Sequence, residues 1–194
     1  LVVRSVEECD EACHNDITVA TSLLEARILA GNVAQAGLPM QLLNKNWSQT
    51  KFYEAKMAEA KARYLKHNST EYNLEPDLKN APGGLRDIHT VGWISKRYFR
   101  VTNLFGLVQQ EFITEKEFDE LQQAEDFLWL IRHHLHKIAK RNENRVLFDY
   151  QRLIAERIGY RDNSHPNAAV EQFMRDYYRY AMSNSTLSEM LTQH

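Results

Sequence analysis

The sequence predicts a mainly α fold, in which a helical bundle follows a small α/β remnant at the N-terminus. The helical bundle is predicted mainly from two segments. Apolar residues recur at helical spacing over residues 114–141 and again from about 168 to 191. The first residues differ from both, since Leu1–Arg4 (LVVR) is apolar and β-branched. We therefore expect residues 1–4 to be the end of a strand whose neighbours precede Leu1.

Capping residues and helix breakers divide the next segment. Ser5 is a favourable N-cap with two glutamates in the turn that follows, which predicts a helix to about residue 15. Asp16 is placed to cap a second helix, and Gly31 is placed to end it. Residues 32–47 are less regular, and their Gly-Leu-Pro run is expected to break any long helix there.

Ser48–Lys66 is a strong helical segment with one apolar face. The residues expected to reach the core are Tyr53, Met57, Ala60 and Tyr64. The remaining charged residues alternate in sign and are expected to face water: Lys51, Glu54, Lys56, Glu59, Lys61 and Arg63.

The rest of the chain is predicted to be helical almost throughout. Thr114 and Glu117 have the spacing of a capping box at the start of the longest helix, over 114–141. Val146–Ile158 is amphipathic and precedes a polar loop and the last long helix. Ile88–Arg100 is also consistent with a helix. Leu85, Asp87, His89 and Val91 alternate as in a short strand, so the spacing of apolar residues alone does not decide between helix and strand.

Composition limits the classes of partner and compartment. With 194 residues, 43% of them hydrophobic, the chain can bury one sizeable core. A net charge of −2 provides no global positive field that would favour DNA, RNA or an anionic membrane surface. Two cysteines, Cys9 and Cys13, and the lack of an apolar stretch long enough to span a membrane predict a reduced, cytoplasmic protein.

Segment 72–91 (YNLEPDLKNAPGGLRDIHTV) lies between helix-like segments and holds two of the four prolines. Gly83 and Gly84 can take positive φ and leave room for a close approach, so backbone N–H groups there can point outward. A helix that opens just after these glycines would direct its free N–H groups and its dipole at the same spot. The segment is therefore a candidate anion-binding loop.

Charged side chains flank these glycines. Lys79 and Arg86 would complete an anion site, the lysine as a point charge and the arginine through its fork of donors. Asp87 beside them could hold a metal ion or orient the cations. A Pro-Gly turn with solvated charges fits the same spacing, with Asp87 capping the next helix or pairing with Arg86 or Lys79.

The run EPDLKNAPGGLRDIHTVGWISKRYF, Glu75–Phe99, resembles a known family. It is similar to the segment that follows the nucleotidyltransferase core of the bacterial bifunctional uridylyltransferase/uridylyl-removing enzymes, which modify the PII nitrogen-signalling protein. The likeness continues through Asp16–Arg27, Lys51–Lys66, Asn144–Asp149 and Met174–Tyr180, so it covers essentially the whole chain.

The resemblance implies a UTP-dependent protein uridylyltransferase, which transfers UMP to a tyrosine of PII and releases pyrophosphate. Catalysis of such a transfer is mainly positioning and charge neutralisation by Mg²⁺ ions. By its position in the matching motif, Asp87 is the candidate catalytic carboxylate and magnesium ligand. Lys79, Gly83, Gly84 and Arg86 are the candidate nucleotide-binding residues.

Several elements of the family are absent from this sequence. It contains no Gly-Ser dipeptide and no Asp-x-Asp, which supply two metal-binding carboxylates in the superfamily, and no His-Asp dipeptide of a hydrolase domain. We expect residues 1–66 to be the C-terminal part of a nucleotidyltransferase region and 67–194 the helical domain that carries the 72–91 loop. The chain alone is expected to be inactive and to depend on upstream and downstream domains. Glu75 is expected to be structural, holding the loop against the helices.

Two other functions fit the same residues. A non-catalytic helical module could dock PII or neighbouring domains, with the 72–91 loop serving only the architecture. A related protein adenylyltransferase, the enzyme family that modifies glutamine synthetase, carries a similar K…GG-[IL]-R-[DE] run. The words NLEP, APGGLRDIHT and RVLFD favour the uridylyltransferase, although nothing in the chemistry of these residues selects uracil over adenine.

Overall fold

The computed structural model describes residues 2–66, 72–163 and 165–193, and these residues form nine α-helices and one short 3-10 turn, which confirms the mainly α prediction. The helices are α1 Val6–Asn15, α2 Ile17–Leu24, α3 Leu38–Asn46, α4 Gln49–Lys66, α5 Leu85–Tyr98, α6 Phe105–Gln109, α7 Glu115–Ala139, α8 Phe148–Arg157 and α9 Ala168–Gln193. No helix of the described ranges has both the length and the apolar character needed to cross a membrane.

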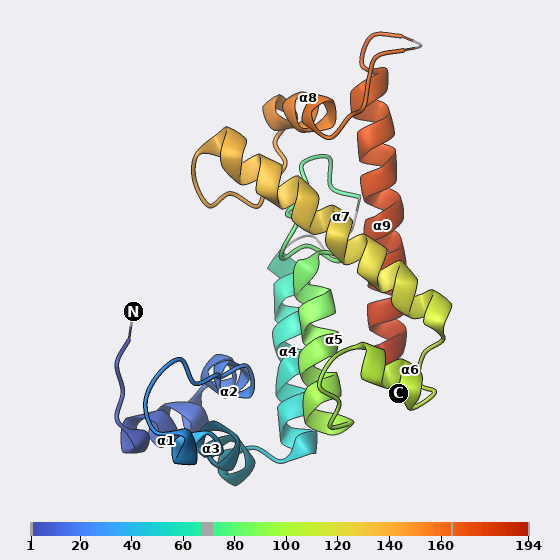
Figure 1. Cartoon of the computed structure of the whole chain (residues 1–194). Coiled ribbons are helices and arrows are strands. Elements are labelled where there is room, and N and C mark those ends of the chain that lie inside the picture. The colour runs from blue at the N-terminus through green and yellow to red at the C-terminus, as the bar shows by residue number, and fades with distance from the viewer. Residues whose placement is uncertain (1, 67–71, 164, 194) are drawn as a thin grey trace.

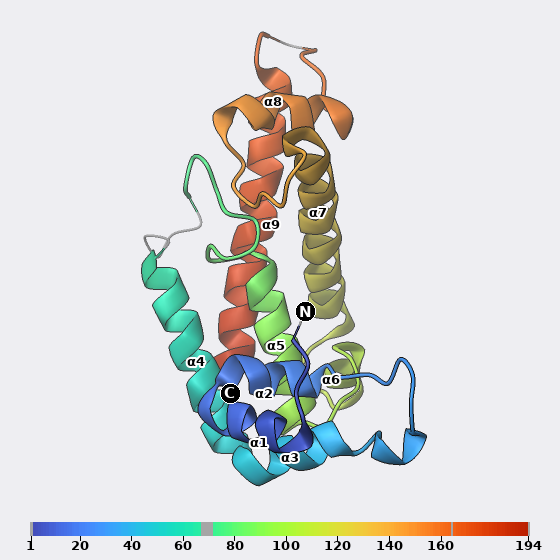
Figure 2. The same ribbon diagram turned by 90° about the vertical axis from the view of Figure 1, so that its left-hand side faces the viewer.

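Helices α4, α5, α7 and α9 run along the length of the molecule (Figures 1 and 2). The small helices α1, α2 and α3 gather at one end, and α8 closes the other. Helix α7 crosses the bundle and packs most extensively on α9, while α5 lies between α4, α7 and α9. The segment that opens α5 therefore sits at the centre of the molecule.

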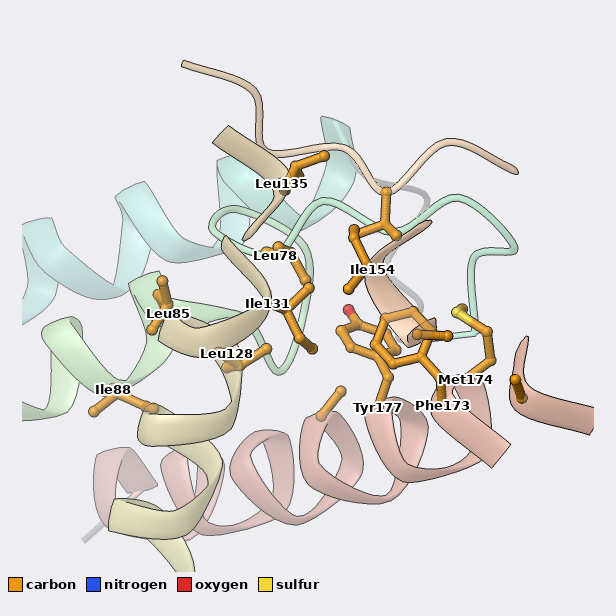
Figure 3. Close-up of a cluster of buried hydrophobic side chains, with 14 residues drawn as sticks. Leu78, Leu85, Ile88, Leu128, Ile131, Leu135, Ile154, Phe173, Met174 and Tyr177 are labelled. Carbon is orange, nitrogen blue, oxygen red and sulfur yellow. The ribbon is translucent and has the colours of Figure 1, made fainter. Parts of the chain in front are cut away.

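The main core lies where α5, α7, α8 and α9 meet (Figure 3). Tyr177 and Phe173 of α9 are its largest side chains, and Leu78 reaches into it from the segment before α5. Burying side chains of this size contributes roughly 1.5–3 kcal/mol each. The 72–91 segment thus contributes Leu78, Leu85 and Ile88 to the core, whereas Tyr72 and Leu74 at its start are exposed.

A second core joins the small helices to the bundle. It contains Cys13, Ala20, Leu43, Trp47 and Phe52, and partly buried apolar side chains pack around it. The indole of Trp47 donates to the Cys13 backbone carbonyl at 2.6 Å, which ties α1 to the start of α4.

Three predicted helix starts are confirmed by their caps. Ser5 forms a capping box at α1, and the Asp16 carboxylate accepts from the Thr18 N–H at 2.7 Å at the start of α2. The Thr114–Glu117 capping box at α7 is complete, since Thr114 N–H donates to the glutamate at 2.7 Å and Glu117 N–H donates back at 3.2 Å. These caps depend on local sequence alone, which is why spacing predicted them.

For the N-terminal segment, one prediction was wrong and one stays a prediction. Residues 2–4 are exposed and have no regular secondary structure. The predicted strand requires a neighbour that none of the described residues supplies, so its formation stays a prediction; Leu1 lies outside these residues. The second helix ends at Leu24 and does not continue to Gly31. Residues 38–46 form α3, with Pro39 in its first turn, where its missing N–H costs nothing.

The buried face of α4 differs from the predicted one. Ala60 is buried as expected, but the other fully buried residues are Phe52 and Lys56. The Lys56 ammonium lies 4.3 Å from the centre of the Trp93 ring and pairs with Glu59 at 2.5 Å. The aromatic ring and the carboxylate offset the desolvation of a charge that was expected to face water.

Candidate functional site

The segment before α5 is a compact turn with its own hydrogen bonds. The Asp77 carboxylate accepts from the N–H groups of Lys79 and Asn80 at 2.9 and 2.7 Å. The turn then folds back on itself, because Arg86 N–H donates to the Lys79 carbonyl at 2.9 Å. The backbones of Lys79 and Arg86 are therefore neighbours, although seven positions separate them in the sequence.

Gly83 permits a close contact between this turn and α9. Its φ is +75°, and a Cβ built on it would lie 2.1 Å from the backbone oxygen of Ala181. Asn184, which is fully buried on α9, donates to the carbonyl oxygens of Gly83 and Gly84 at 2.8 and 3.2 Å. The glycines thus let the turn lie directly against a helix, the role that a missing side chain permits.

The N–H groups of the two glycines do not point outward, so that part of the sequence-based expectation was wrong. Gly83 N–H donates to Oδ2 of Asp87 at 2.7 Å, and Gly84 N–H donates to the Ala81 carbonyl at 2.9 Å. Helix α5 does open directly after them, with Gly84 as its N-cap, as expected. These glycine amides are committed within the turn in this conformation.

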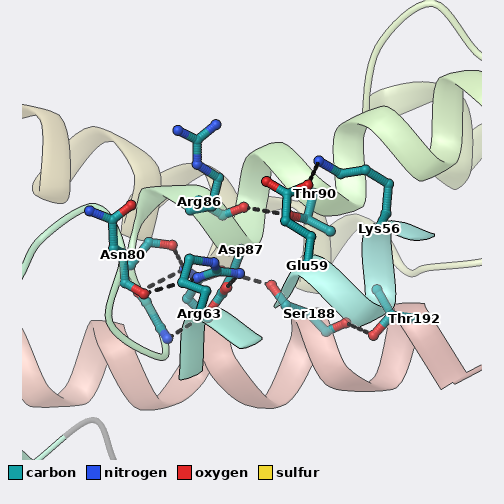
Figure 4. A network of polar contacts seen from close by, with 12 residues as sticks. Lys56, Glu59, Arg63, Asn80, Arg86, Asp87, Thr90, Ser188 and Thr192 are labelled. Carbon is teal, nitrogen blue, oxygen red and sulfur yellow. Dashed lines mark hydrogen bonds and ion pairs between the residues drawn. The ribbon is translucent and has the colours of Figure 1, made fainter. Parts of the chain in front are cut away.

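Asp87 lies in the first turn of α5 and is buried among donors (Figure 4). Arg63 of α4 donates to its Oδ1 at 2.8 Å, and the exposed fractions of the two side chains are 12% and 1%. Burial raises the pKa of the Asp87 carboxyl, while the Arg63 guanidinium, the Gly83 N–H and the Tyr64 hydroxyl oppose that rise. The ion-pair partner of Asp87 is therefore Arg63, and neither Arg86 nor Lys79 pairs with it.

Arg63 and Asn184 hold this turn from two other helices, and no sequence pattern predicts either contact. Arg63 also donates to the Asn80 carbonyl at 3.1 Å, so it braces the turn at two points. The charge pattern of its helix predicts that Arg63 faces water. Arg63 and Asn184 lie 24 and 97 positions away from Asp87 in the sequence. No local spacing links them to it, so only the tertiary fold reveals these contacts.

A cavity of about 370 Å³ opens beside Asp87, between α4, α5 and α9. Its polar lining includes Arg63, Tyr64, Asp87, Ser188 and Thr192. The hydroxyls of Ser188 and Thr192 donate back within α9, to the Asn184 side-chain oxygen and the Ser188 carbonyl at 3.1 and 2.8 Å. Asp87 thus lies in the wall of the cavity, although its side chain is 1% exposed and both of its oxygens accept hydrogen bonds.

The described residues around Asp87 do not fit a magnesium site. Both of its oxygens accept hydrogen bonds, one of them from a guanidinium. No group of three or more His, Cys, Asp or Glu side chains in the described ranges could hold a metal ion. A hard cation requires several oxygen ligands, so Asp87 would have to release Arg63 and act with carboxylates from elsewhere. Its catalytic and metal-binding role stays a prediction.

The two predicted cations lie together, but away from Asp87. Figure 4 shows the Arg86 side chain pointing to the opposite side of α5 from Arg63. Burial and the nearby charges of Arg86 and Arg132 lower the pKa of Lys79. The structure therefore divides the predicted site into the Asp87 cavity and a separate group of cations.

Glu75 has the structural role predicted for it. Its side chain accepts from Phe148 N–H, at the start of α8, at 3.0 Å and pairs with Arg145 at 3.5 Å. The first part of the loop is thereby held against the segment between α7 and α8.

The fold and site define an all-helical domain whose Pro-Gly-Gly turn opens a central helix over a buried Arg–Asp pair. A family model described as GlnD PII-uridylyltransferase matches residues 51–192, which span α4 to α9 without interruption. This chain belongs to that family.

Relatives with the name bifunctional uridylyltransferase/uridylyl-removing enzyme match all or nearly all of the chain. The protein of Psychrobacter sp. (strain PRwf-1) is 64% identical over 100% of this chain and 22% of its own length. That of Psychrobacter arcticus is 63% identical over 100% and 21%, and that of Acinetobacter baumannii (strain AYE) is 54% identical over 97% and 22%. The chain spans about a fifth of the length of these relatives. No solved structure matches it.

Proposed function

We propose that this chain is the helical part of a UTP-dependent uridylyltransferase that transfers UMP to a tyrosine of the PII protein and releases pyrophosphate. The observation that carries the proposal is the uninterrupted family match over residues 51–192, which includes the whole turn and both cations. Identity of 64% along the full chain supports the same function for the longer protein. We further propose that it works in the cytoplasm.

In this proposal Lys79 and Arg86 bind the negatively charged end of UTP. Their backbones are joined by a hydrogen bond of 2.9 Å, and the Arg86 charge is close enough to lower the pKa of Lys79. Charge-assisted hydrogen bonds to phosphate are worth about 1.5–3 kcal/mol each. Gly83 and Gly84 contribute indirectly, by letting the turn pack on α9.

Mg²⁺ is proposed as the ion that accompanies UTP, bound by carboxylates outside this chain. It would neutralise charge on the phosphates during transfer. This chain's own contribution is to bind and orient the nucleotide and to keep Asp87 at the edge of its cavity. On this basis the chain alone does not catalyse transfer.

The proposal is tested in the Psychrobacter sp. (strain PRwf-1) protein carrying this chain in place of its matching segment, hereafter the chimeric enzyme. Incorporation of labelled UMP from UTP into PII is measured. Lys79→Ala and Arg86→Ala are each expected to raise the KM for UTP about 10-fold, the loss of one charge-assisted contact. Arg175→Ala, at an exposed arginine of α9, is the matched control and should leave KM unchanged. Unaltered KM in both test variants would remove these residues from the site.

A non-catalytic docking module is the second candidate, and one observation favours it. The amides of the turn and both oxygens of Asp87 are already engaged within the protein. In that case Asp87→Asn would lower stability, and UMP transfer would fall only as far as folding does. Transfer reduced by orders of magnitude in Asp87→Asn protein that circular dichroism shows to be folded would exclude it.

A further inference from the structure

The surface between α5 and α7 carries a third cation that sequence analysis did not assign. Asn144 places it there: its backbone carbonyl accepts from Leu78 N–H, and its side-chain oxygen accepts from Nε of Arg132, both at 2.9 Å. Leu78 directly precedes Lys79, so Arg132 of α7 is held beside the turn that carries Lys79 and Arg86. We call these three residues the cation face.

The cation face lacks negative partners in the described part of the chain. None of the ion pairs among the described residues includes Lys79, Arg86 or Arg132. Arg132 donates instead to the neutral side chains of Asn144 and Asn142, at 2.9 and 3.3 Å. Holding like charges together without anions is unfavourable unless a bound anion compensates them.

Aromatic rings connect this face to a neighbouring hollow. Arg86 lies 5.4 Å from the Trp93 ring, and Arg132 lies 5.1 Å from the Trp129 ring. His89 stands between the two indoles, with ring centres 5.8 Å from Trp93 and 6.4 Å from Trp129. Two cations and three flat rings thus form one continuous surface across α5 and α7.

The hollow has a volume of about 440 Å³ and lies between α5, α6 and α7. His89, Gly92 and Trp93 line its α5 side, and Gln122 and Glu125 line its α7 side. A Cβ added at Gly92 would meet nothing within 4 Å, so no close contact requires a glycine there. A glycine inside a helix costs up to about 1 kcal/mol relative to alanine, and here it leaves the wall of the hollow open.

We propose that this surface is a nucleotide-binding site, in which Lys79, Arg86 and Arg132 bind the phosphates and the hollow beside His89 and Gly92 holds the nucleoside. The inference rests on the proposed function, which supplies UTP as the nucleotide and pyrophosphate as the product. Arginine forks match phosphate oxygens, and indole and imidazole rings match a flat base. The Gln122 amide, whose nitrogen donates to Asp126 at 3.2 Å, and the Glu125 carboxylate line the hollow and offer acceptor oxygens for the polar groups of the base and ribose.

The test has two readouts. In the chimeric enzyme, Arg132→Ala is expected to raise the KM for UTP and the inhibition constant of pyrophosphate about 10-fold each. In calorimetry with the 194-residue chain, pyrophosphate binding should weaken by the same factor. Arg132→Lys, which keeps the charge, should retain part of the binding, and Lys137→Ala, an exposed lysine farther along α7, should change nothing.

Gly92→Leu tests the hollow without touching the cations. The leucine side chain would occupy the space proposed for the nucleoside, so UTP binding should weaken about 10-fold or more while pyrophosphate binding stays the same. Normal UTP binding in this variant would overturn the nucleoside part of the proposal. Thermal unfolding of each variant separates loss of the site from loss of the fold.

The outcomes also separate this inference from the proposed function. If the chimeric enzyme transfers UMP but Arg132→Ala leaves KM and pyrophosphate binding unchanged, the inference is overturned and the function stands. If the chimeric enzyme transfers no UMP, yet the chain binds pyrophosphate and loses it with Arg132→Ala, the binding site stands and the function falls.

Discussion

Asp87 and Arg63 form a nearly dry ion pair, with exposed fractions of 1% and 12%, at the point where three helices meet. Breaking such a pair by removing one partner leaves an uncompensated charge and costs about 3–5 kcal/mol. Replacing both partners by apolar residues of similar size is often neutral, because the desolvation cost of both charges disappears.

We therefore expect Asp87→Asn to lower the free energy of unfolding by about 3 kcal/mol, since the amide keeps the shape but not the charge. Urea unfolding of the 194-residue chain measures it. The double variant Arg63→Met/Asp87→Leu is the control, and its stability should return to within about 1 kcal/mol of the original. Full stability in the single variant would show that the pair does not support the fold.

His89 provides a pH-dependent contribution to stability. Burial and the charges of Arg86, Lys79 and Arg132 lower its pKa from 6.5 to about 4, and only Glu25 acts in the opposite direction. As pH falls, His89 therefore takes up its proton at a higher pH in the unfolded chain than in the folded chain. The contribution of His89 is fully present above pH 6.5 and is lost as pH falls toward 4.

The expected size of this effect is about 1–2 kcal/mol, after allowing for solvent screening at a half-buried ring. Because carboxylates titrate in the same range, the measurement is the difference between the original chain and His89→Gln in urea unfolding at pH values on either side of this window. NMR titration of the imidazole measures the pKa directly. A midpoint near the usual 6.5 would contradict the prediction.

At the scale of single residues, the sequence identified which charged residues belong to the turn, but it did not predict which residues they contact. Lys79, Arg86 and Asp87 lie within four positions of the glycine pair, so a local motif revealed them. Arg63, Arg132 and Asn184 come from other helices and carry no spacing signal, since a charged or polar residue on an amphipathic helix normally faces water. Their contacts follow from how α4, α7 and α9 pack around the turn.

The turn and α5 form one continuous element, which contains Gly83 and Gly92. The fold requires a glycine at the first position but not at the second. A Cβ at Gly83 would collide with the backbone of α9, and its φ of +75° is strained for any other residue. A Cβ at Gly92 would enter open space. These two positions form a matched pair for testing which glycine the fold requires.

Gly83→Ala is expected to destabilise the chain by about 3 kcal/mol or more, because backbone strain and a clash with Ala181 add to each other. Gly92→Ala is expected to stabilise it by up to about 1 kcal/mol through helix propensity. Thermal or urea unfolding of both variants checks the pair. Equal stability of the two would contradict the close contact between the turn and α9.

The sequence predicted where most helices lie, but it did not always predict which face of a helix is buried. The starts of α1, α2 and α7 are set by capping side chains that act within four residues. The buried face of α4 is set instead by its packing against α5 and α2, which places Phe52 and Lys56 inside. The apolar pattern of one helix cannot predict that Lys56 is buried. The Trp93 ring and the Glu59 carboxylate stabilise its charge, and neither is part of that pattern.

At the scale of the whole molecule, the predicted division between residues 66 and 67 remains a prediction, and residue 67 lies outside the described ranges. Helix α4 lies on the N-terminal side of that division, yet it packs along α5 and supplies Arg63 to Asp87. The family match begins at residue 51, near the start of α4 and not after its end. From these observations we infer that α4 folds together with α5 to α9.

We expect a fragment of residues 48–194, which keeps Ser48 as the first cap of α4, to unfold cooperatively in urea. A fragment of residues 67–194 should lose cooperative unfolding, because Asp87 would lose its counter-charge at a cost of about 3–5 kcal/mol. Exposure of the core that α4 covers adds to that loss, and the total approaches the 5–15 kcal/mol typical of a domain. Circular dichroism and amide exchange of α5 measure both fragments. Equal stability of the two would instead establish 67–194 as an independent domain, with Asp87 free to bind a ligand in place of Arg63.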